Sequence, residues 1–345
     1  MYSSNTNVLL NIEEHIWGNT AMKLYISVVI GTGPCDRLTR SKMASRWGDL
    51  GEIRIALLGK TGVGKSHLGN NLLQQNAFGV YAGFGKSGSL CSLYAERKLD
   101  DHTNLFVVDT PGLFDTRQPN EKTKKEIVRS IALAAPGPFV YIFVIAIGRF
   151  TKEEVDTIDI LQEILGDDVI NHVIIVFTRK EDLGDMLIND FVLKSPPGLR
   201  NLIQKCHQRF AFINNKGNQA SLKAETSYIF DLIHKTIEDN KHVYFTNRMY
   251  QDAEQILNER SQEIQKEVDR SIRELRQKRI SLENRGNVDT LKAQLLAIDS
   301  EIAAKNHMQP KKRAKEELLQ QDSSLLGNVL DRMKSAWRSF TTVFH

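Results

Sequence analysis

The sequence Gly59-Lys-Thr-Gly-Val-Gly-Lys-Ser66 constrains this chain more than any other feature. It matches G-x-x-x-x-G-K-[ST] and stands between a short apolar run, residues 53–58, and a helical pattern that begins at Ser66. Glycines in such a loop let backbone N–H groups turn inward around phosphate oxygens, and the N-terminus of the following helix adds its dipole. The order strand, loop, helix therefore predicts a phosphate-binding loop rather than a chance glycine-rich turn.

Two side chains of this loop have predicted roles. Lys65 would reach the β- and γ-phosphates of a nucleotide as a point charge, and the Ser66 hydroxyl would hold Mg²⁺. The candidate nucleotide ligands in this part of the chain are Gly59, Lys60, Thr61, Gly62, Val63, Gly64, Lys65, Ser66 and His67.

Five short apolar runs predict the strands of one sheet. They cover residues 53–58, 105–108, 140–147, 173–177 and 210–213. Helical patterns lie between most of them, among others at residues 66–75, 120–134 and 152–165. Continuous apolar strands that alternate with helices indicate a parallel sheet covered on both faces. The predicted fold class is α/β: a doubly wound, mostly parallel sheet with a C-terminal α-helical extension.

The chain of 345 residues is longer than one such domain requires by about a hundred residues. We therefore predict four segments. Residues 1–50 carry no motif and are expected to be a poorly structured extension. Residues 51–240 form the nucleotide-binding domain, and residues 241–322 form a helical arm. The arm either makes a coiled coil or packs on its own domain. Residues 323–345 form an amphipathic helix.

Charge, cysteine content and hydropathy indicate the expected partners and cellular location of the chain. A formal net charge of +4 gives no argument for nucleic acid, and we expect no nucleic-acid partner. Three cysteines, an odd number at no metal or disulfide spacing, fit a reducing compartment. No run reaches the roughly 18 apolar residues of a membrane span. The expected location is cytoplasmic, with a peripheral position on a cytosolic membrane face as the alternative.

A second motif, Asp109-Thr-Pro-Gly112, follows the second predicted strand. The Asp109 carboxylate at a strand end can bind Mg²⁺ through water, and the Gly112 N–H can contact the γ-phosphate. Loss of that contact on hydrolysis is how such a loop switches conformation. Asp-Thr-Pro-Gly is also a good turn sequence, but its place after a phosphate loop favours the switch interpretation.

Beyond these motifs, the chain resembles the GIMAP family of GTPases, whose AIG-type G domain is related to septins and chloroplast-import receptors. The resemblance covers about residues 52–235 and implies a P-loop G domain that uses GTP/GDP and Mg²⁺. The segment GRFTKEE, residues 148–154, matches a box that is specific to the family. The matching stretches are Gly59–Ser66, Asp109–Thr116, Pro136–Glu154 and Phe177–Leu183.

The resemblance implies that Arg179-Lys180-Glu181-Asp182 selects guanine. The chemistry is consistent, because the two Asp182 oxygens can accept from guanine N1–H and its exocyclic amine, donors that adenine does not present together. Lys180 would lay its aliphatic stem along the base. Asn214 aligns with the last nucleotide-binding position of the family, with Asn215 as the neighbouring alternative. Both are also ordinary turn residues.

The first switch departs from the family pattern S-x-T-x-x-C. Here the sequence is Ser87-Gly-Ser-Leu-Cys-Ser92, which places Ser89 at the metal-binding threonine. A serine hydroxyl can still ligate Mg²⁺. If Cys91 is the aligned cysteine instead, Gly88 takes that position and the loop offers no ligand.

Leu113 stands where many GTPases carry a glutamine that orients the attacking water. Leucine has no polar atom, so intrinsic hydrolysis is expected to be slow. The resemblance implies dimerisation through the nucleotide faces of G domains, as a homodimer or with related chains. Arg149 of the family box could then act across the interface as an arginine finger. Its alternative role is that of a surface residue before a helix.

The C-terminal segment has an apolar stripe with bases among the intervening residues. Such a helix suits either a membrane interface or a protein surface, and the cluster Lys311-Lys312-Arg313 would add attraction to anionic lipid. The stripe consists of Leu326, Leu330, Met333, Trp337, Phe340 and Phe344.

The sequence thus predicts a GTP-binding switch with slow or dimer-stimulated hydrolysis. Leu113 keeps open a second hypothesis, a non-hydrolysing scaffold of septin-like character. A third, an enzyme that acts on ATP, is disfavoured by Asp182.

Overall fold

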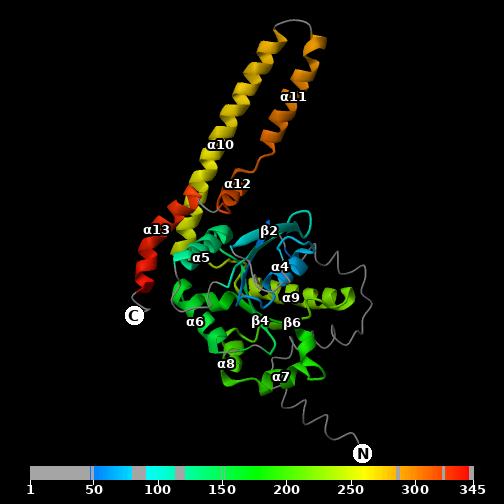
Figure 1. The fold of residues 1–345 in the computed structure, drawn as a ribbon, viewed down its shortest axis with the longest axis vertical. Coiled ribbons are helices and arrows are strands. Elements are labelled where there is room, and N and C mark those ends of the chain that lie inside the picture. The colour runs from blue at the N-terminus through cyan, green and yellow to red at the C-terminus, as the bar shows by residue number, and fades with distance from the viewer. Residues whose placement is uncertain are drawn as a thin grey trace, which may run out of the picture.

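The computed structural model describes residue 47 and residues 50–79, 91–112, 121–148, 150, 152–284, 288–320 and 323–341. Six strands form one sheet in the order β2-β3-β1-β4-β5-β6. Figure 1 shows this sheet among its helices. All neighbours in it are parallel except β2 and β3, which are antiparallel. The strands are β1 (Glu52–Leu58), β2 (Leu93–Lys98), β3 (Asn104–Asp109), β4 (Val140–Ala146), β5 (Val173–Thr178) and β6 (Phe210–Ile213).

Helices cover both faces of this sheet, and the strands divide their side chains between two cores. In β1, Ile53, Ile55 and Leu57 face one core and Ala56 and Leu58 face the other. This alternation explains why the strands read as continuous apolar runs. The first core contains α4 (Lys65–Leu73) and α9 (Gln219–Asp239), and the second contains α5 (Glu121–Ala134), α6 (Lys152–Leu165) and α8 (Pro197–Lys205).

The predicted mostly parallel α/β fold is confirmed, and the helix at residues 152–165 has the predicted bounds. Strand β2 was not predicted. Its sequence LYAERK alternates with polar residues, and none of its side chains is fully buried, because it lies at the sheet edge. An antiparallel edge strand of this kind does not form a continuous apolar run in the sequence.

Trp47 belongs to the segment predicted as a poorly structured extension, yet its side chain is buried. It packs edge-on against Phe230 and His234 of α9. The other residues of the segment up to Asp49 lie outside the described part of the chain.

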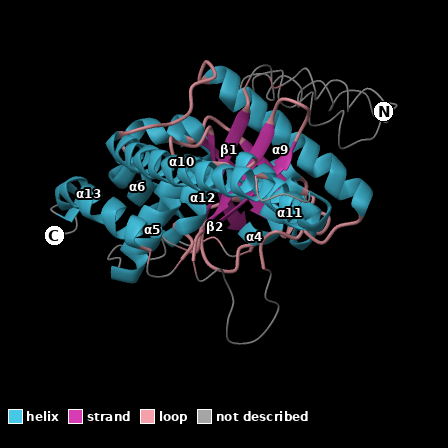
Figure 2. Ribbon diagram, turned by 90° about the horizontal axis from the view of Figure 1, so that it is seen from above, coloured by secondary structure: helices cyan, strands magenta, loops and turns pink. Residues whose placement is uncertain are grey.

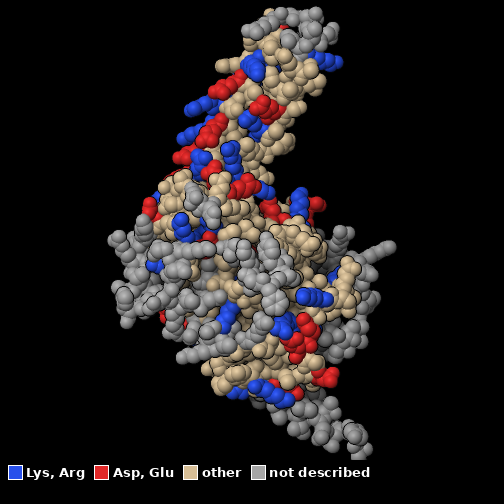
Figure 3. Space-filling view, in the orientation of Figure 1, with Lys and Arg blue, Asp and Glu red and all other residues tan. Residues whose placement is uncertain are grey.

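A helical hairpin projects from the sheet domain, as Figure 1 shows. It consists of α10 (Arg248–Glu283) and α11 (Val288–Asn306), which pack on each other. The first turns of α10 pack on the domain, where the Tyr141 hydroxyl of β4 bonds the Tyr250 hydroxyl at 2.7 Å. Farther out, the surface of the hairpin carries side chains of both charge signs (Figure 3).

Two shorter helices, α12 (Pro310–Glu317) and α13 (Ser324–Thr341), lie at the base of the hairpin against α10. Helix α13 also packs on α5. Leu326 and Met333 of the predicted apolar stripe are buried here. The side chains of Trp337, Phe340 and Phe344 lie outside the described residues.

The sheet domain also contains short 3-10 helices at Asp167–His172 and Lys180–Leu183, and helix α7 (Ile188–Lys194).

Candidate nucleotide-binding site

The predicted phosphate loop connects β1 to α4 at the carboxyl-terminal edge of the sheet. Three of its glycines have positive φ angles: Gly59 at 134°, Gly62 at 80° and Gly64 at 97°. A Cβ atom on Gly59 would lie 2.4 Å from the Val144 carbonyl oxygen of β4, whereas one on Gly62 would meet open space. The close approach of β4 therefore requires glycine at position 59, and the backbone turn favours it at position 62.

We expect Gly59→Ala to lower the free energy of unfolding by about 3 kcal/mol or more, because backbone strain and a backbone clash add up. The matched variant Gly62→Ala carries the strain alone and should lose about 1 kcal/mol. Urea denaturation of both variants measures the difference. Equal losses would show that contact with β4 does not constrain the loop.

The Lys65 ammonium lies within the loop. Its Nζ donates to the carbonyl oxygens of Gly59 at 2.8 Å and Lys60 at 2.7 Å, and the side chain is buried. The backbone N–H groups of the loop and of the α4 N-terminus lie beside this ammonium. The arrangement gives one side-chain cation and several fixed donors for phosphate oxygens.

The structure brings together two predicted metal ligands from positions 43 residues apart. Ser66 Oγ donates to Asp109 Oδ2 at 2.6 Å, and Asp109 is fully buried at the end of β3. Next to it, Thr110 Oγ1 donates to the Leu57 carbonyl oxygen at 2.6 Å, which fixes β3 beside β1. A hydroxyl and a carboxylate beside a phosphate site are the hard oxygen donors that Mg²⁺ prefers, so the residues present fit this ion.

Other predicted residues of the γ-phosphate side are described only in part. Gly112 is half-buried two residues beyond Thr110. Ser89, Leu113 and Arg149 lie outside the described residues. The flanks of Arg149 are described: Gly148 and Phe150 follow the end of β4, so the family box leaves the sheet at the same edge as the phosphate loop.

The predicted base-recognition segment follows β5 and is joined to the phosphate loop. Thr178 Oγ1, at the end of β5, donates to the Val63 carbonyl oxygen at 2.5 Å. Arg179 then adopts a left-handed conformation with φ of 60°. Its guanidinium forms an ion pair with Asp182 Oδ2 at 2.7 Å, on a side chain that is one-third exposed. The carboxylate is therefore both fixed and accessible.

A buried glutamate that sequence reasoning missed connects the two base-side loops. Glu225 of α9 accepts from Lys180 Nζ through Oε1 at 2.7 Å and from the Asn214 backbone N–H through Oε2 at 2.9 Å. It holds the lysine stem and the loop after β6 in a fixed relation. The available signal was an acidic residue on the buried face of an amphipathic helix, which alone indicates no partner.

The two asparagines after β6 have different roles. The Asn214 side-chain oxygen accepts from the Lys216 backbone N–H at 3.0 Å, as in a turn. The Asn215 amide donates to the Gly64 carbonyl oxygen at 3.2 Å and accepts from Asn71 Nδ2 at 3.0 Å. Asn215 therefore holds the phosphate loop, a role that the sequence did not reveal.

His67 lies in the first turn of α4, after Ser66. Partial burial, and secondly the charge of Lys216, lower the pKa of its imidazole below the ordinary value. Both effects disfavour the protonated form. The side chain is thus expected to be neutral where the phosphates would approach.

The predicted site residues that the structure describes meet at one edge of the sheet, after β1, β3, β5 and β6. A glycine loop with a buried lysine, a serine–aspartate pair for a hard cation and an exposed aspartate beyond the fourth parallel strand define a P-loop G domain. The AIG1 family model matches residues 53–267. The chain belongs to the AIG1 family.

Relatives of the chain are described as GTPases or as nucleotide-binding proteins. GTPase IMAP family member 8 of Homo sapiens is 35% identical over 186 residues, which are 54% of this chain and 27% of the relative. Immune-associated nucleotide-binding protein 9 of Arabidopsis thaliana is 29% identical over 209 residues, 58% of this chain and 60% of the relative. The chain thus spans between about a quarter and three-fifths of these relatives.

Toc33 of Arabidopsis thaliana is among the solved structures to which the chain is similar. A dimerisation-deficient mutant matches with 16% identity and a TM-score of 0.45, covering 61% of this chain and 95% of Toc33. Toc33 in complex with Mg²⁺ and GMPPNP matches with 17% identity and a TM-score of 0.44, covering 58% and 92%.

Proposed function

We propose that this protein is a GTP-binding switch that hydrolyses GTP to GDP slowly, or with stimulation by dimerisation, and assembles through its G domain. The observation that carries the proposal is the direct connection of the phosphate loop to the two base-side loops. Thr178 at the end of β5 bonds Val63, and Asn215 in the loop after β6 bonds Gly64. Two loops that each bind part of a nucleotide are thereby held in one rigid frame.

In this proposal the chain's own residues divide the nucleotide between them. The loop N–H groups and Lys65 bind the phosphates, and Ser66 and Asp109 hold Mg²⁺, which neutralises phosphate charge. Lys180, oriented by Glu225, lies along the base. Asp182 accepts from the base edge and exchanges part of its pairing with Arg179 for the guanine donors.

Asp182→Ala is expected to weaken GDP and GTP binding by about a hundredfold, because the guanine donors lose their acceptor. Weak binding of ATP should not change. Titration of a fluorescent GDP analogue, with ATP as competitor, measures both effects. Asp185→Ala removes an exposed carboxylate three residues further on and serves as the matched control. Unchanged GDP affinity in the Asp182 variant would remove guanine recognition from this segment.

Leu113 supports the alternative function, a nucleotide-dependent scaffold that does not hydrolyse GTP. A leucine side chain at that position has no polar atom to orient water. The two functions differ in one observable: a scaffold gives no turnover above background at any protein concentration. Either function would have the chain assemble with itself or with related G domains through the nucleotide face.

The C-terminal helix carries a further hypothesis, contact with a cytosolic membrane face. The described helices include none long and apolar enough to cross a membrane. Leu326 and Met333 are covered by the molecule itself, and Lys311 and Lys312 pair with Glu254 and Glu96. These contacts favour packing of the first half of α13 on helices of its own chain. Co-sedimentation with anionic liposomes, for the parent chain and for the double variant Trp337→Ser and Phe340→Ser, tests the second half of α13. A membrane role is rejected if the two proteins sediment with liposomes to the same extent.

A further inference from the structure

A cleft of about 180 Å³ lies between α12 and the sheet edge at the start of β1. Its walls come from β1, β2, β3, the turn after α5 and α12. Figure 2 shows α12 in front of the sheet, with β1 and β2 labelled on either side of it. The phosphate loop leaves the opposite end of β1, so this cleft is separate from the nucleotide site.

Cations outnumber carboxylates in the lining, which includes Arg54, Lys311, Lys312 and Lys315 but only Glu52 and Glu96 as acids. Three of the four cations have carboxylate partners: Arg54 pairs with Glu52 at 3.3 Å, Lys311 with Glu254 at 2.5 Å, and Lys312 with Glu96. Among the residues that the structure describes, no carboxylate pairs with the fourth cation.

That fourth cation, Lys315, is also the most buried lysine of the cleft, with 6% of its surface exposed. Its Nζ donates to the Ala135 carbonyl oxygen at 3.2 Å and lies 4.3 Å from the centre of the Phe106 ring. An ammonium has three donors, and a buried charge without a counter-charge is costly. Glu52 and Glu254 act on Lys315 only from a distance, so an anion that entered the cleft would supply a direct ionic partner.

Burial lowers the pKa of Lys315 to about 8, with Arg54 and Lys311 adding to the effect and Glu52 and Glu254 opposing it. Beside it, burial raises the pKa of Tyr94 to about 12, aided by Glu316 and Glu96. The phenol therefore stays protonated and can donate. An anion in the cleft would favour the charged form of Lys315.

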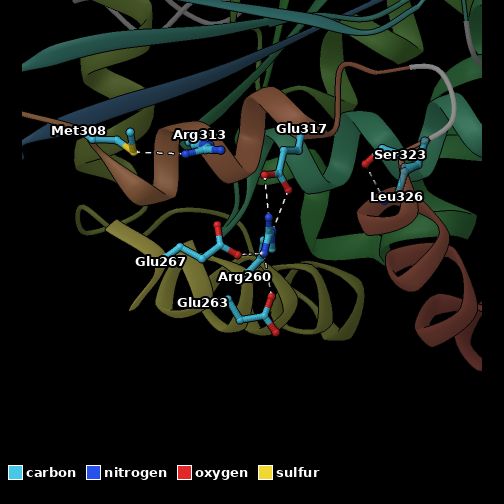
Figure 4. Close-up of polar contacts among 8 residues, drawn as sticks. All are labelled: Arg260, Glu263, Glu267, Met308, Arg313, Glu317, Ser323 and Leu326. Atoms are coloured by element: carbon cyan, nitrogen blue, oxygen red, sulfur yellow. Dashed lines mark hydrogen bonds and ion pairs between the residues drawn. The ribbon is translucent and has the colours of Figure 1, made fainter. Parts of the chain in front are cut away.

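Helix α12 is held firmly enough to keep such a site in shape. Arg260 of α10 grips Glu317 with two bonds, Nε to Oε2 at 2.9 Å and Nη2 to Oε1 at 3.0 Å (Figure 4). Glu263 and Glu267 pair with the same guanidinium. The first turn of α12, which carries Lys311 and Lys312, lines the cleft and adds the positive end of its dipole.

We propose that this cleft binds a small anion of the phosphate class, either free phosphate or a phosphate monoester, with Lys315 as its central cation. The volume accommodates a phosphate group together with a few further atoms. The stacked rings of Tyr94 and Phe106, 4.9 Å apart, form an apolar wall for the ester group.

Calorimetric titration with inorganic phosphate tests the proposal on the full chain saturated with Mg²⁺ and a non-hydrolysable GTP analogue, so that the phosphate loop is occupied. We expect one site per chain, weakened about tenfold or more by Lys315→Met, since a charge-assisted bond is lost. Lys292→Met removes an exposed lysine from the hairpin and should change nothing. Titration with glycerol phosphate distinguishes the sources: tighter binding than phosphate indicates a monoester as ligand.

Lys312→Gln keeps the test valid if Lys315→Met fails to fold, because Lys312 lies at the exposed rim of the cleft. It should weaken phosphate binding several-fold. The proposal is overturned if phosphate does not bind, or if Lys292→Met weakens binding as much as either cleft variant, which would indicate only diffuse attraction to a basic chain. If the chain does not bind the GTP analogue, the same titration without it still tests the cleft.

Discussion

Replacing Lys65 by alanine is expected to weaken GTP and GDP binding by about a hundredfold or more, because a buried charge that bonds phosphate oxygens is lost. The fold should survive. The Lys65 ammonium bonds two carbonyls of its own loop, at Gly59 and Lys60, so these bonds do not join one secondary-structure element to another. Titration of a fluorescent GDP analogue gives the affinity, and circular dichroism confirms that the variant is folded.

Lys60→Ala provides the matched control within the same loop. Position 60 offers Lys65 its backbone carbonyl, which alanine retains. We expect its GDP affinity to stay within a few-fold of the parent protein. A Lys65 variant that binds GDP as tightly as the Lys60 variant would refute the assignment of the phosphate site.

The second large effect is expected at Arg149. If this residue acts across a dimer interface, Arg149→Ala should lower the concentration-dependent part of GTP turnover on the order of 10³-fold, the usual contribution of an arginine finger supplied in trans. GDP affinity should remain unchanged, because a finger contacts the transition state rather than the bound product. Single-turnover assays at high protein concentration measure the rate.

Lys152→Ala, in the same family box, is the control for a general loss of positive charge. Mixing the Arg149 variant with a Lys65→Ala chain tests whether Arg149 acts on nucleotide bound to the other chain. The Lys65 variant supplies an intact Arg149 but binds nucleotide poorly itself. Recovery of turnover in the mixture supports action in trans. An unchanged rate in Arg149→Ala alone would leave the residue in its alternative role before the helix.

The parts of the candidate site that depend on one segment can be proposed from local sequence. The phosphate loop was readable because glycines, lysine and serine at fixed spacing serve one function in a strand–loop–helix context. Ser66 and Asp109 were predicted separately as metal ligands, and the structure places their oxygens in contact. The strand that ends at Asp109 explains why: parallel β1 and β3 end at the same edge.

What could not be predicted depends on partners distant in sequence. Glu225 and Asn215 hold the site through bonds to Lys180 and Gly64, and neither residue belongs to a recognisable spacing. The amphipathic pattern of α13 was equally visible in the sequence, but a pattern does not name the surface that covers it. Only the three-dimensional structure shows that Leu326 and Met333 are buried, in a helix that packs on α10 and α5.

In the proposed function, this chain is a guanine-nucleotide switch that works through assembly of its G domains. Single-turnover hydrolysis of GTP at rising protein concentration, with light scattering alongside to report mass, tests it most directly. We expect a hydrolysis rate that is slow at low protein concentration and rises as the mass measured by light scattering doubles in the presence of GTP. A rate that stays at the background of free GTP at every concentration would contradict hydrolysis and leave the scaffold function in its place.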